Sequence, residues 1–266
     1  WLLHRGGPDW GGRKYRVMAR SYTISFKIMT PMIELLVGRD NLVLLTDSET
    51  LVTTLSKYYK RTFHLVPIPH MPGDHADHAD HIKDTGSHDR VVCWWPGTPR
   101  AEKGTDIIQR LASIKDRDAY KVVLIAAKSA NLTVQDGCSR IETVDDKLVR
   151  QDYENRFFTS DLILLPYDRD IYSESTSGIF TECIVAGATP LVTRDTWMAY
   201  ELEKMGLGEL AIDWESDLIV QQIISLATND SIKQKIREMQ AKYRSFHSIP
   251  SFARTLDSLY KLAPLS

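Results

Sequence analysis

The hydrophobic positions of this chain fall into short apolar runs that alternate with amphipathic stretches. The runs at 91–95, 121–127, 161–165 and 190–193 have the length and the flanking turn residues of buried strands. Strands that alternate with helices at this spacing predict an α/β fold, a doubly wound, Rossmann-like parallel sheet. A further short strand is expected at 209–212, and helices are expected at 105–113, 147–159, 179–186, 197–205, 218–227, 231–246 and 252–262.

The N-terminal part predicts a smaller α/β fragment. A strand at 41–46, a helix from residue 47 or 48 to 60, and a strand at 62–68 form one βαβ-like unit. A helix is also expected within 17–37. The N-terminal part therefore indicates a partial second α/β domain ahead of the main sheet.

Residues 71–90 differ in composition from both parts. Asp-His-Ala repeats place His75, His78 and His81 at intervals of three, beside aspartates. Imidazole and carboxylate groups could bind zinc or nickel. A solvated linker is the favoured interpretation because no ordered scaffold is evident to hold metal ligands, so no metal site is predicted.

Composition limits the classes of function. The 266 residues are 43% hydrophobic and 26% charged, and the net charge of −2 gives no reason to expect a nucleic-acid partner. No apolar run is long enough for a transmembrane helix, and the first residues do not form a signal peptide. The absence of an initiator Met suggests a chain cut from something longer. Cys93, Cys138 and Cys183 are far apart and odd in number, which favours free thiols in a reducing cytoplasm.

The stretch 161–187 holds the most distinctive candidate chemistry. Its buried strand ends at Pro166, a polar loop of small residues follows, and the helix expected from Ile179 is closed by Gly187. A loop that enters a helix N-terminus offers free backbone N–H groups and the positive end of the helix dipole. The sequence therefore predicts an anion site here, flanked by the carboxylates of Glu174 and Glu182.

A second loop, 96–104, also follows a strand and opens a helix. It carries Arg100 and Lys103. Because ligands of doubly wound sheets bind at the carboxyl ends of the strands, loops 96–104, 166–178 and 194–197 are expected on one rim. The alternative is that this segment is a solvated basic turn. Its location on the rim favours phosphate binding, in which the planar guanidinium of Arg100 could form two hydrogen bonds and Lys103 would supply a compact positive charge.

The two carboxylates allow several uses. Glu174 and Glu182 could be a general acid/base pair as in glycoside hydrolysis, acceptors for vicinal hydroxyl groups, or simple charges at a helix terminus. A nucleotide sugar carries both phosphates and hydroxyl groups. Hydrogen-bond donors for phosphate beside carboxylates that accept from hydroxyls therefore indicate a site for a nucleotide sugar.

These residues together resemble a known family. Glu174 and Glu182 with seven residues between them, Ser177-Gly178 at the helix start, and the Glu-Lys-Gly sequence at 102–104 are similar to the donor-binding half of GT-B glycosyltransferases. The retaining, glycosyltransferase family 4-like group with the Glu-x7-Glu motif is the most similar. The resemblance covers about residues 90–215, and to a lesser degree 62–70.

The resemblance implies a hexosyltransferase that uses a nucleotide-diphosphate sugar and a carbohydrate or lipid-linked acceptor. Arg100 and Lys103 would hold the diphosphate, and Glu174 would contact the transferred sugar; these three would be the catalytic residues. No cofactor or metal is required, and peripheral association with the inner membrane surface is compatible with such acceptors. The implied donor-binding residues are Thr98, Thr176, Ser177, Gly178, Ile179 and Glu182, the last of these for the ribose.

The sequence departs from the family at two positions. Thr98 stands where the family has an Arg, and Ser177 stands where it has the motif glycine. The expected domains are an acceptor-side fragment (1–70), a linker (71–90), a donor-binding domain (91–245) and a C-terminal helix that returns toward the first domain (246–266). A nucleotide-sugar 2-epimerase and a non-catalytic nucleotide-sugar-binding module are the alternative functions.

Overall fold

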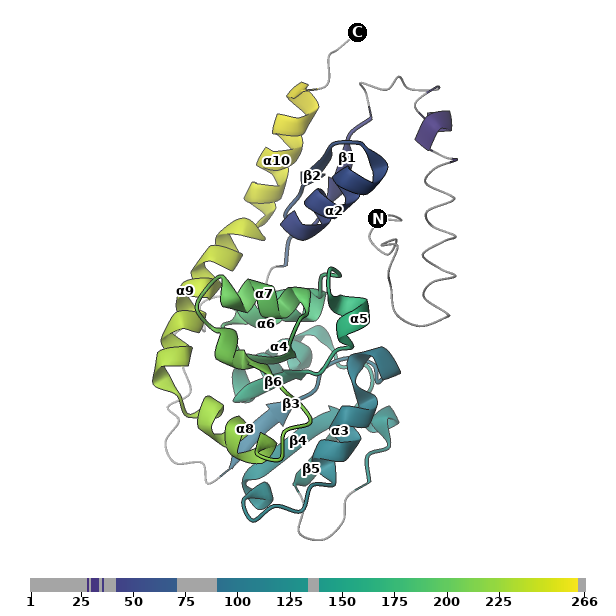
Figure 1. The fold of residues 1–266 in the computed structure, drawn as a ribbon. Coiled ribbons are helices and arrows are strands. Elements are labelled where there is room, and N and C mark those ends of the chain that lie inside the picture. Colours follow the sequence, from purple (N-terminus) through teal and green to yellow (C-terminus); the bar gives the residue numbers. More distant parts are fainter. Residues whose placement is uncertain are drawn as a thin grey trace. The chain divides into compact units, whose positions relative to one another are not determined.

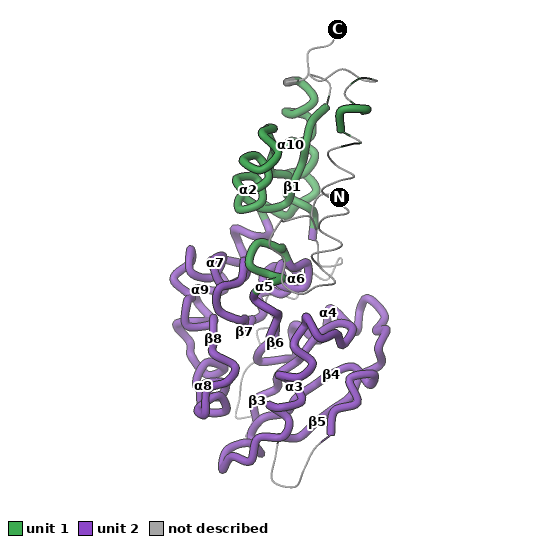
Figure 2. Tube along the Cα trace, turned by 45° about the vertical axis from the view of Figure 1, so that its right-hand side comes forward, with its two compact units in different colours: residues 1–69, 170–176, 245–266 green, residues 70–169, 177–244 purple. Residues whose placement is uncertain are grey.

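The computed structural model describes residues 42–70, 90–133 and 139–262, together with residues 28, 30–33 and 35. Most of the helix expected at 17–37, the linker histidines and Cys138 lie outside these residues. The chain divides into two compact units. The first contains residues 1–69, 170–176 and 245–266, and the second contains 70–169 and 177–244 (Figure 2).

The second unit is built on a parallel sheet of six strands in the order β5-β4-β3-β6-β7-β8. Successive strands run outward from β3 in one direction and from β6 in the other, so the order reverses between these two neighbours. This is the doubly wound arrangement predicted from the sequence. The strands are β3 (Val91–Trp94), β4 (Val122–Ala127), β5 (Arg140–Val144), β6 (Leu162–Leu165), β7 (Pro190–Thr193) and β8 (Ala211–Ile212).

Helices pack around this sheet (Figure 1), and the interior strands β4 and β6 are buried along their whole length. Both faces of such strands are covered, which is why they appear in the sequence as continuous apolar runs. The helices that belong wholly or mainly to this unit include α3 (Thr105–Ala112), α4 (Arg150–Thr159), α6 (Gly178–Ala186), α7 (Trp197–Glu203), α8 (Ile219–Ala227) and α9 (Asp230–Phe246). Helices α5 (Arg169–Tyr172) and α10 (Ile249–Leu262) belong mainly or wholly to the first unit.

Several boundaries differ from those expected. Strand β5 pairs with β4 over five residues and was not among the expected strands. Its residues are intermediate or exposed, as at a sheet edge, so no apolar run marks it. Helix α4 begins at Arg150 because Val149 is still extended, and α5 was not predicted. Helix α10 begins at Ile249, where Pro250 fits the first turn.

The first unit contains two parallel strands, β1 (Leu44–Thr46) and β2 (Phe63–Leu65), with α2 (Glu49–Tyr59) between them in the chain. The Ser48 hydroxyl accepts from the N–H of Leu51 at 3.1 Å, so Ser48 is the N-cap of α2. A small core holds the strands and helix together; it consists of Leu44, Leu51, Leu55 and Phe63.

The described residues include two of the three cysteines and most of the expected helices. Cys93 and Cys183 are buried free thiols, as predicted. Within the described ranges, no helix combines the length and the apolar character needed to cross a membrane.

Candidate functional site

The start of α6 has the features of an anion site. Ser177 is its N-cap, and the Ser177 hydroxyl accepts from the N–H of Phe180 at 3.2 Å. The N–H groups of Gly178 and Ile179 have no acceptor among the described residues, and Gly178 is exposed. Two free donors therefore remain at the positive end of the helix dipole.

Loop 96–104 is fixed against the carboxyl end of β6. The indole N–H of Trp95 donates to the Lys103 carbonyl at 3.1 Å, and the N–H of Asp168 donates to the Glu102 carbonyl at 3.0 Å. Gly104 has a φ of 80°, and a Cβ at this position would lie 2.2 Å from the carbonyl oxygen of Pro166. Glycine is therefore required for this close approach.

Lys103 is a buried cation, with only 9% of the residue exposed. Burial, with a smaller effect of Arg100, lowers its pKa from 10.5 to about 8. Its ammonium lies 5.6 Å from the centre of the Tyr167 ring. Within the part of the chain that the structure describes it forms no hydrogen bond or ion pair, and the Glu102 carboxylate attracts it only weakly, from a longer distance. An ammonium group in this state is uncommon, because buried charges are normally paired.

Gly97 shows that Lys103 and α6 approach the same point. A Cβ on Gly97 would lie 3.2 Å from the Lys103 Nζ and 3.1 Å from the Ile179 Cδ1. The Lys103 ammonium thus lies close to the Ile179 side chain, in the first turn of α6. Loop 96–104 and the start of α6 lie on the same rim of the sheet, as predicted, and this brings Lys103 close to α6.

Arg100 and Thr98 lie in the same loop but are exposed. The Arg100 guanidinium is 3.2 Å from the Glu102 carboxylate, and its side chain is 49% exposed. Its positive charge contributes to the lowered pKa of Lys103. Arg100 is therefore an exposed, ion-paired cation in the same loop as the largely buried Lys103.

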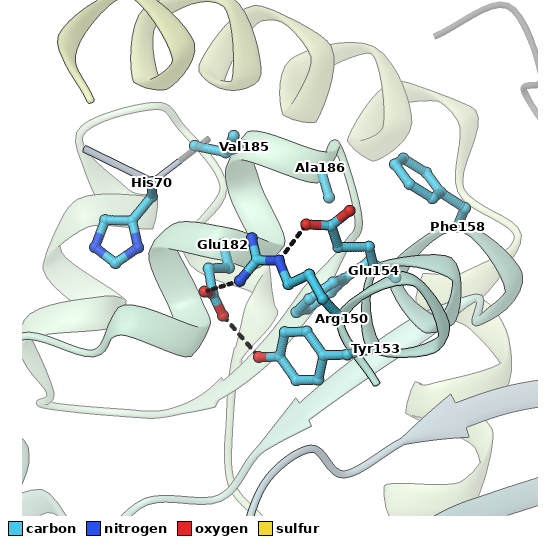
Figure 3. A pocket seen from close by; sticks show the side chains of 9 residues that line it. His70, Arg150, Tyr153, Glu154, Phe158, Glu182, Val185 and Ala186 are labelled. Carbon is cyan, nitrogen blue, oxygen red and sulfur yellow. Dashed lines mark hydrogen bonds and ion pairs between the residues drawn. The ribbon is translucent and has the colours of Figure 1, made fainter. Parts of the chain in front are cut away.

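Glu182 projects from α6 toward α4 (Figure 3). The Tyr153 hydroxyl donates to its Oε2 at 2.6 Å, and the Arg150 Nη1 lies 3.6 Å from its Oε1. Arg150 also forms an ion pair with Glu154, one turn further along α4. These residues line one pocket together with His70, Phe157, Phe158, Val185 and Ala186.

The α4 residues of this pocket were not predicted from the sequence. Arg150, Tyr153 and Glu154 have the i, i+3, i+4 spacing of one helical face, which is a weak signal. Burial and the nearby Glu182 carboxylate raise the pKa of Tyr153 above its usual range, so the phenol remains a donor.

Glu174 and Thr176 belong to the first unit, unlike the other predicted site residues. The Thr54 hydroxyl donates to the Glu174 Oε1 at 2.9 Å, and the Thr176 hydroxyl donates to the Asp47 Oδ2 at 2.7 Å. The second unit therefore brings together Lys103, Gly178 and Ile179, with Glu182 one turn into the same helix.

No known family model matches the chain, and no curated protein matches it. Solved structures do. WaaG, a glycosyltransferase involved in lipopolysaccharide biosynthesis, superimposes with a TM-score of 0.53 at 14% identity over 96% of this chain and 70% of that chain. An α,α-trehalose-phosphate synthase (UDP-forming) from Burkholderia vietnamiensis gives 0.63 at 10% identity, over 96% and 65%.

A third similar structure is TarM of S. aureus, crystallised with UDP and sugars, with a TM-score of 0.56 and 11% identity over 88% of this chain and 46% of that chain. At such identities the likeness establishes the fold, which is the GT-B fold of glycosyltransferases. The chain spans 65% of the length of the trehalose-phosphate synthase and less than half of the length of TarM.

Proposed function

We propose that this chain is the donor-binding part, with a piece of the acceptor-side domain, of a retaining glycosyltransferase. The enzyme would move a hexose from a nucleotide-diphosphate sugar to a carbohydrate or lipid-linked acceptor. One observation carries the proposal: the largely buried Lys103 side chain forms no ion pair among the described residues, and its ammonium and the Ile179 side chain of the first turn of α6 both approach Gly97.

This arrangement favours a phosphate ligand over a purely structural role. A structural buried lysine normally has a carboxylate partner, because an unpaired buried charge is unfavourable. A diphosphate would supply the missing negative charge and would accept from the N–H groups of Gly178 and Ile179. Arg100, exposed and already close by, could add a planar fork to the same anion.

The same groups would assist the departure of the diphosphate. As the bond from the sugar to the diphosphate breaks, negative charge accumulates on the leaving oxygen. A fixed ammonium and a helix N-terminus stabilise this charge without a metal ion, and they require no rearrangement during the reaction. We therefore propose that the enzyme needs neither a metal nor a cofactor.

The remaining roles are assigned by the Glu-x7-Glu spacing. Glu182 would accept from the ribose hydroxyls, and Glu174 would contact the transferred sugar, with Thr98 and Thr176 beside the donor. Ser177 would act mainly by capping α6, since its hydroxyl is already bonded to the N–H of Phe180. Retention and the family 4-like assignment likewise follow from this spacing alone. The acceptor-side role of residues 1–70, the donor-binding role of 91–245 and the association with a membrane surface stay predictions.

Calorimetric titration with UDP-, GDP- and ADP-glucose tests the proposal, with the matching nucleosides as controls. We expect one nucleotide sugar to bind far more tightly than its nucleoside. Slow release of the nucleoside diphosphate would then identify a transferase. Binding without turnover would indicate a non-catalytic module, and formation of the 2-epimer, detected by NMR, would indicate an epimerase. No binding of any nucleotide sugar would refute the proposal.

A further inference from the structure

The contact between Tyr153 and Glu182 joins α4 to the helix that begins at the candidate phosphate site. The phenol donates to the Glu182 Oε2 at 2.6 Å, and the guanidinium of Arg150 stands 3.6 Å from Oε1 (Figure 3). Each carboxylate oxygen therefore faces a different donor on α4. The Glu182 side chain is still 23% exposed, so it remains accessible to a ligand.

The position of the phenol is fixed by aromatic packing. The Tyr153 ring makes edge-to-face contacts with Trp94 of β3 at 5.4 Å and with Phe157 at 5.3 Å between ring centroids. Strand β3 lies at the centre of the sheet, next to β6. The tyrosine hydroxyl is therefore held by the core of the unit, and it can hold the carboxylate in one rotamer.

The bonded carboxylate keeps free capacity to accept. A carboxylate has about four lone-pair positions, and Tyr153 occupies one of them. The two hydroxyl groups of a vicinal diol donate to two acceptor positions on the same side of a carboxylate. A fixed rotamer lowers the entropy lost when the diol binds.

We propose that Tyr153 is a positioning residue that holds Glu182 in the orientation that accepts the 2′- and 3′-hydroxyls of the donor ribose. The inference depends on the proposed function, in which Glu182 binds the ribose. Arg150 supports the same orientation from the other oxygen, and Glu154 holds Arg150 in turn. Helix α4 thereby contributes to the discrimination between ribose and deoxyribose.

A structural role for the contact is the competing explanation. Phe157, Phe158, Val185 and Ala186 line the same pocket, so α4 and α6 also share apolar contacts there. Removal of the hydroxyl alone leaves these contacts intact. The two explanations therefore differ in their ligand dependence: a positioning residue affects only ligands that carry the ribose hydroxyls, whereas a structural residue affects all ligands alike.

The test is Tyr153→Phe, titrated with three ligands: the nucleoside diphosphate that the natural protein binds most tightly, its 2′,3′-dideoxy form, and inorganic pyrophosphate. We expect about 10-fold weaker binding of the nucleoside diphosphate, as for loss of a hydrogen bond to a charged group. The affinities for the dideoxy form and for pyrophosphate should change less than about 2-fold, because neither ligand presents the diol.

Tyr243→Phe is the matched control. The Tyr243 hydroxyl donates to the Glu201 Oε2 at 2.7 Å, so this variant deletes the same kind of bond in the same unit. Both variants should lose similar stability in a melting experiment, and only Tyr153→Phe should change ribose-dependent affinity. Equal losses for all three ligands, or no loss for any, would overturn the positioning role while the proposed function stands. If the natural protein binds none of the ligands, the proposed function fails, and the positioning role fails with it.

Discussion

Replacement of Lys103 by Met should make the protein more stable at neutral pH and unable to hold a diphosphate. The pKa of Lys103 falls from 10.5 to about 8 in the folded chain, chiefly through burial. At about 1.36 kcal/mol per pH unit, this fall corresponds to roughly 3 kcal/mol of unfavourable free energy for the charged side chain. Met keeps the length of the side chain and removes the charge, so Lys103→Met should gain about 2–3 kcal/mol at pH 7 after loss of the contact with Tyr167.

The pH dependence of this gain follows from the sign of the pKa change. Below pH 8 the lysine is charged in both the folded and the unfolded chain, and the whole unfavourable term is present. Between pH 8 and pH 10.5 the unfolded chain holds the proton while the folded chain releases it, so the natural protein gains stability as the pH rises. The stability difference between the two proteins should therefore disappear toward pH 10.5.

Urea unfolding of both proteins at pH 7 and pH 10.5 measures the difference directly. Lys121→Met is the control, because Lys121 is 38% exposed and paired with Asp118 at 2.7 Å, so it should gain nothing at pH 7. A Lys103→Met protein that is less stable than the natural one at pH 7 would refute the reasoning, since it would show that the ammonium already has a favourable partner.

Three further predictions concern the same unit. Gly104→Ala should cost about 2–5 kcal/mol in urea unfolding, because its Cβ would meet the backbone carbonyl of Pro166. Gly206→Ala, with φ of 65° and only an ordinary contact to the Lys235 Nζ at 3.9 Å, should cost about 1 kcal/mol. Equal losses would contradict the close packing of loop 96–104. Glu182→Ala should weaken nucleoside diphosphate binding by about 1–3 kcal/mol and leave pyrophosphate binding unchanged in calorimetry. An unchanged nucleoside diphosphate affinity would exclude the ribose role. Addition of EDTA should leave the affinity for nucleoside diphosphates unaltered, and a loss of binding would show that a metal takes part.

The placement of loop 96–104 beside the start of α6 could be predicted from the sequence because the features involved are local. A strand, a short loop and a helix start are adjacent in the chain, so Lys103 and α6 could be placed on one rim from the spacing of elements alone. The structure adds what spacing does not reveal, namely that Lys103 is buried and that Ser177 caps α6.

The surroundings of Glu182 and Glu174 depend on packing between distant segments. Tyr153 and Glu182 are separated by 29 positions, and their contact requires the relative rotation of α4 and α6, which no local pattern specifies. The hydrogen bond from Thr54 to Glu174 spans 120 positions, and the grouping of residues 170–176 with the first unit was likewise not predictable. Polar loop residues carry no periodicity that indicates which surface they pack against.

The central claim is that Lys103 and the start of α6 bind the diphosphate of a nucleotide sugar. Calorimetric titration of a nucleoside diphosphate into the natural protein and into Lys103→Met at pH 7 tests it most directly, with the corresponding nucleoside as reference. We predict that the natural protein binds the diphosphate about 100-fold more tightly than the nucleoside, and that Lys103→Met loses most of this difference. Equal affinity of the natural protein for both ligands, or an unchanged difference in the variant, would contradict the claim.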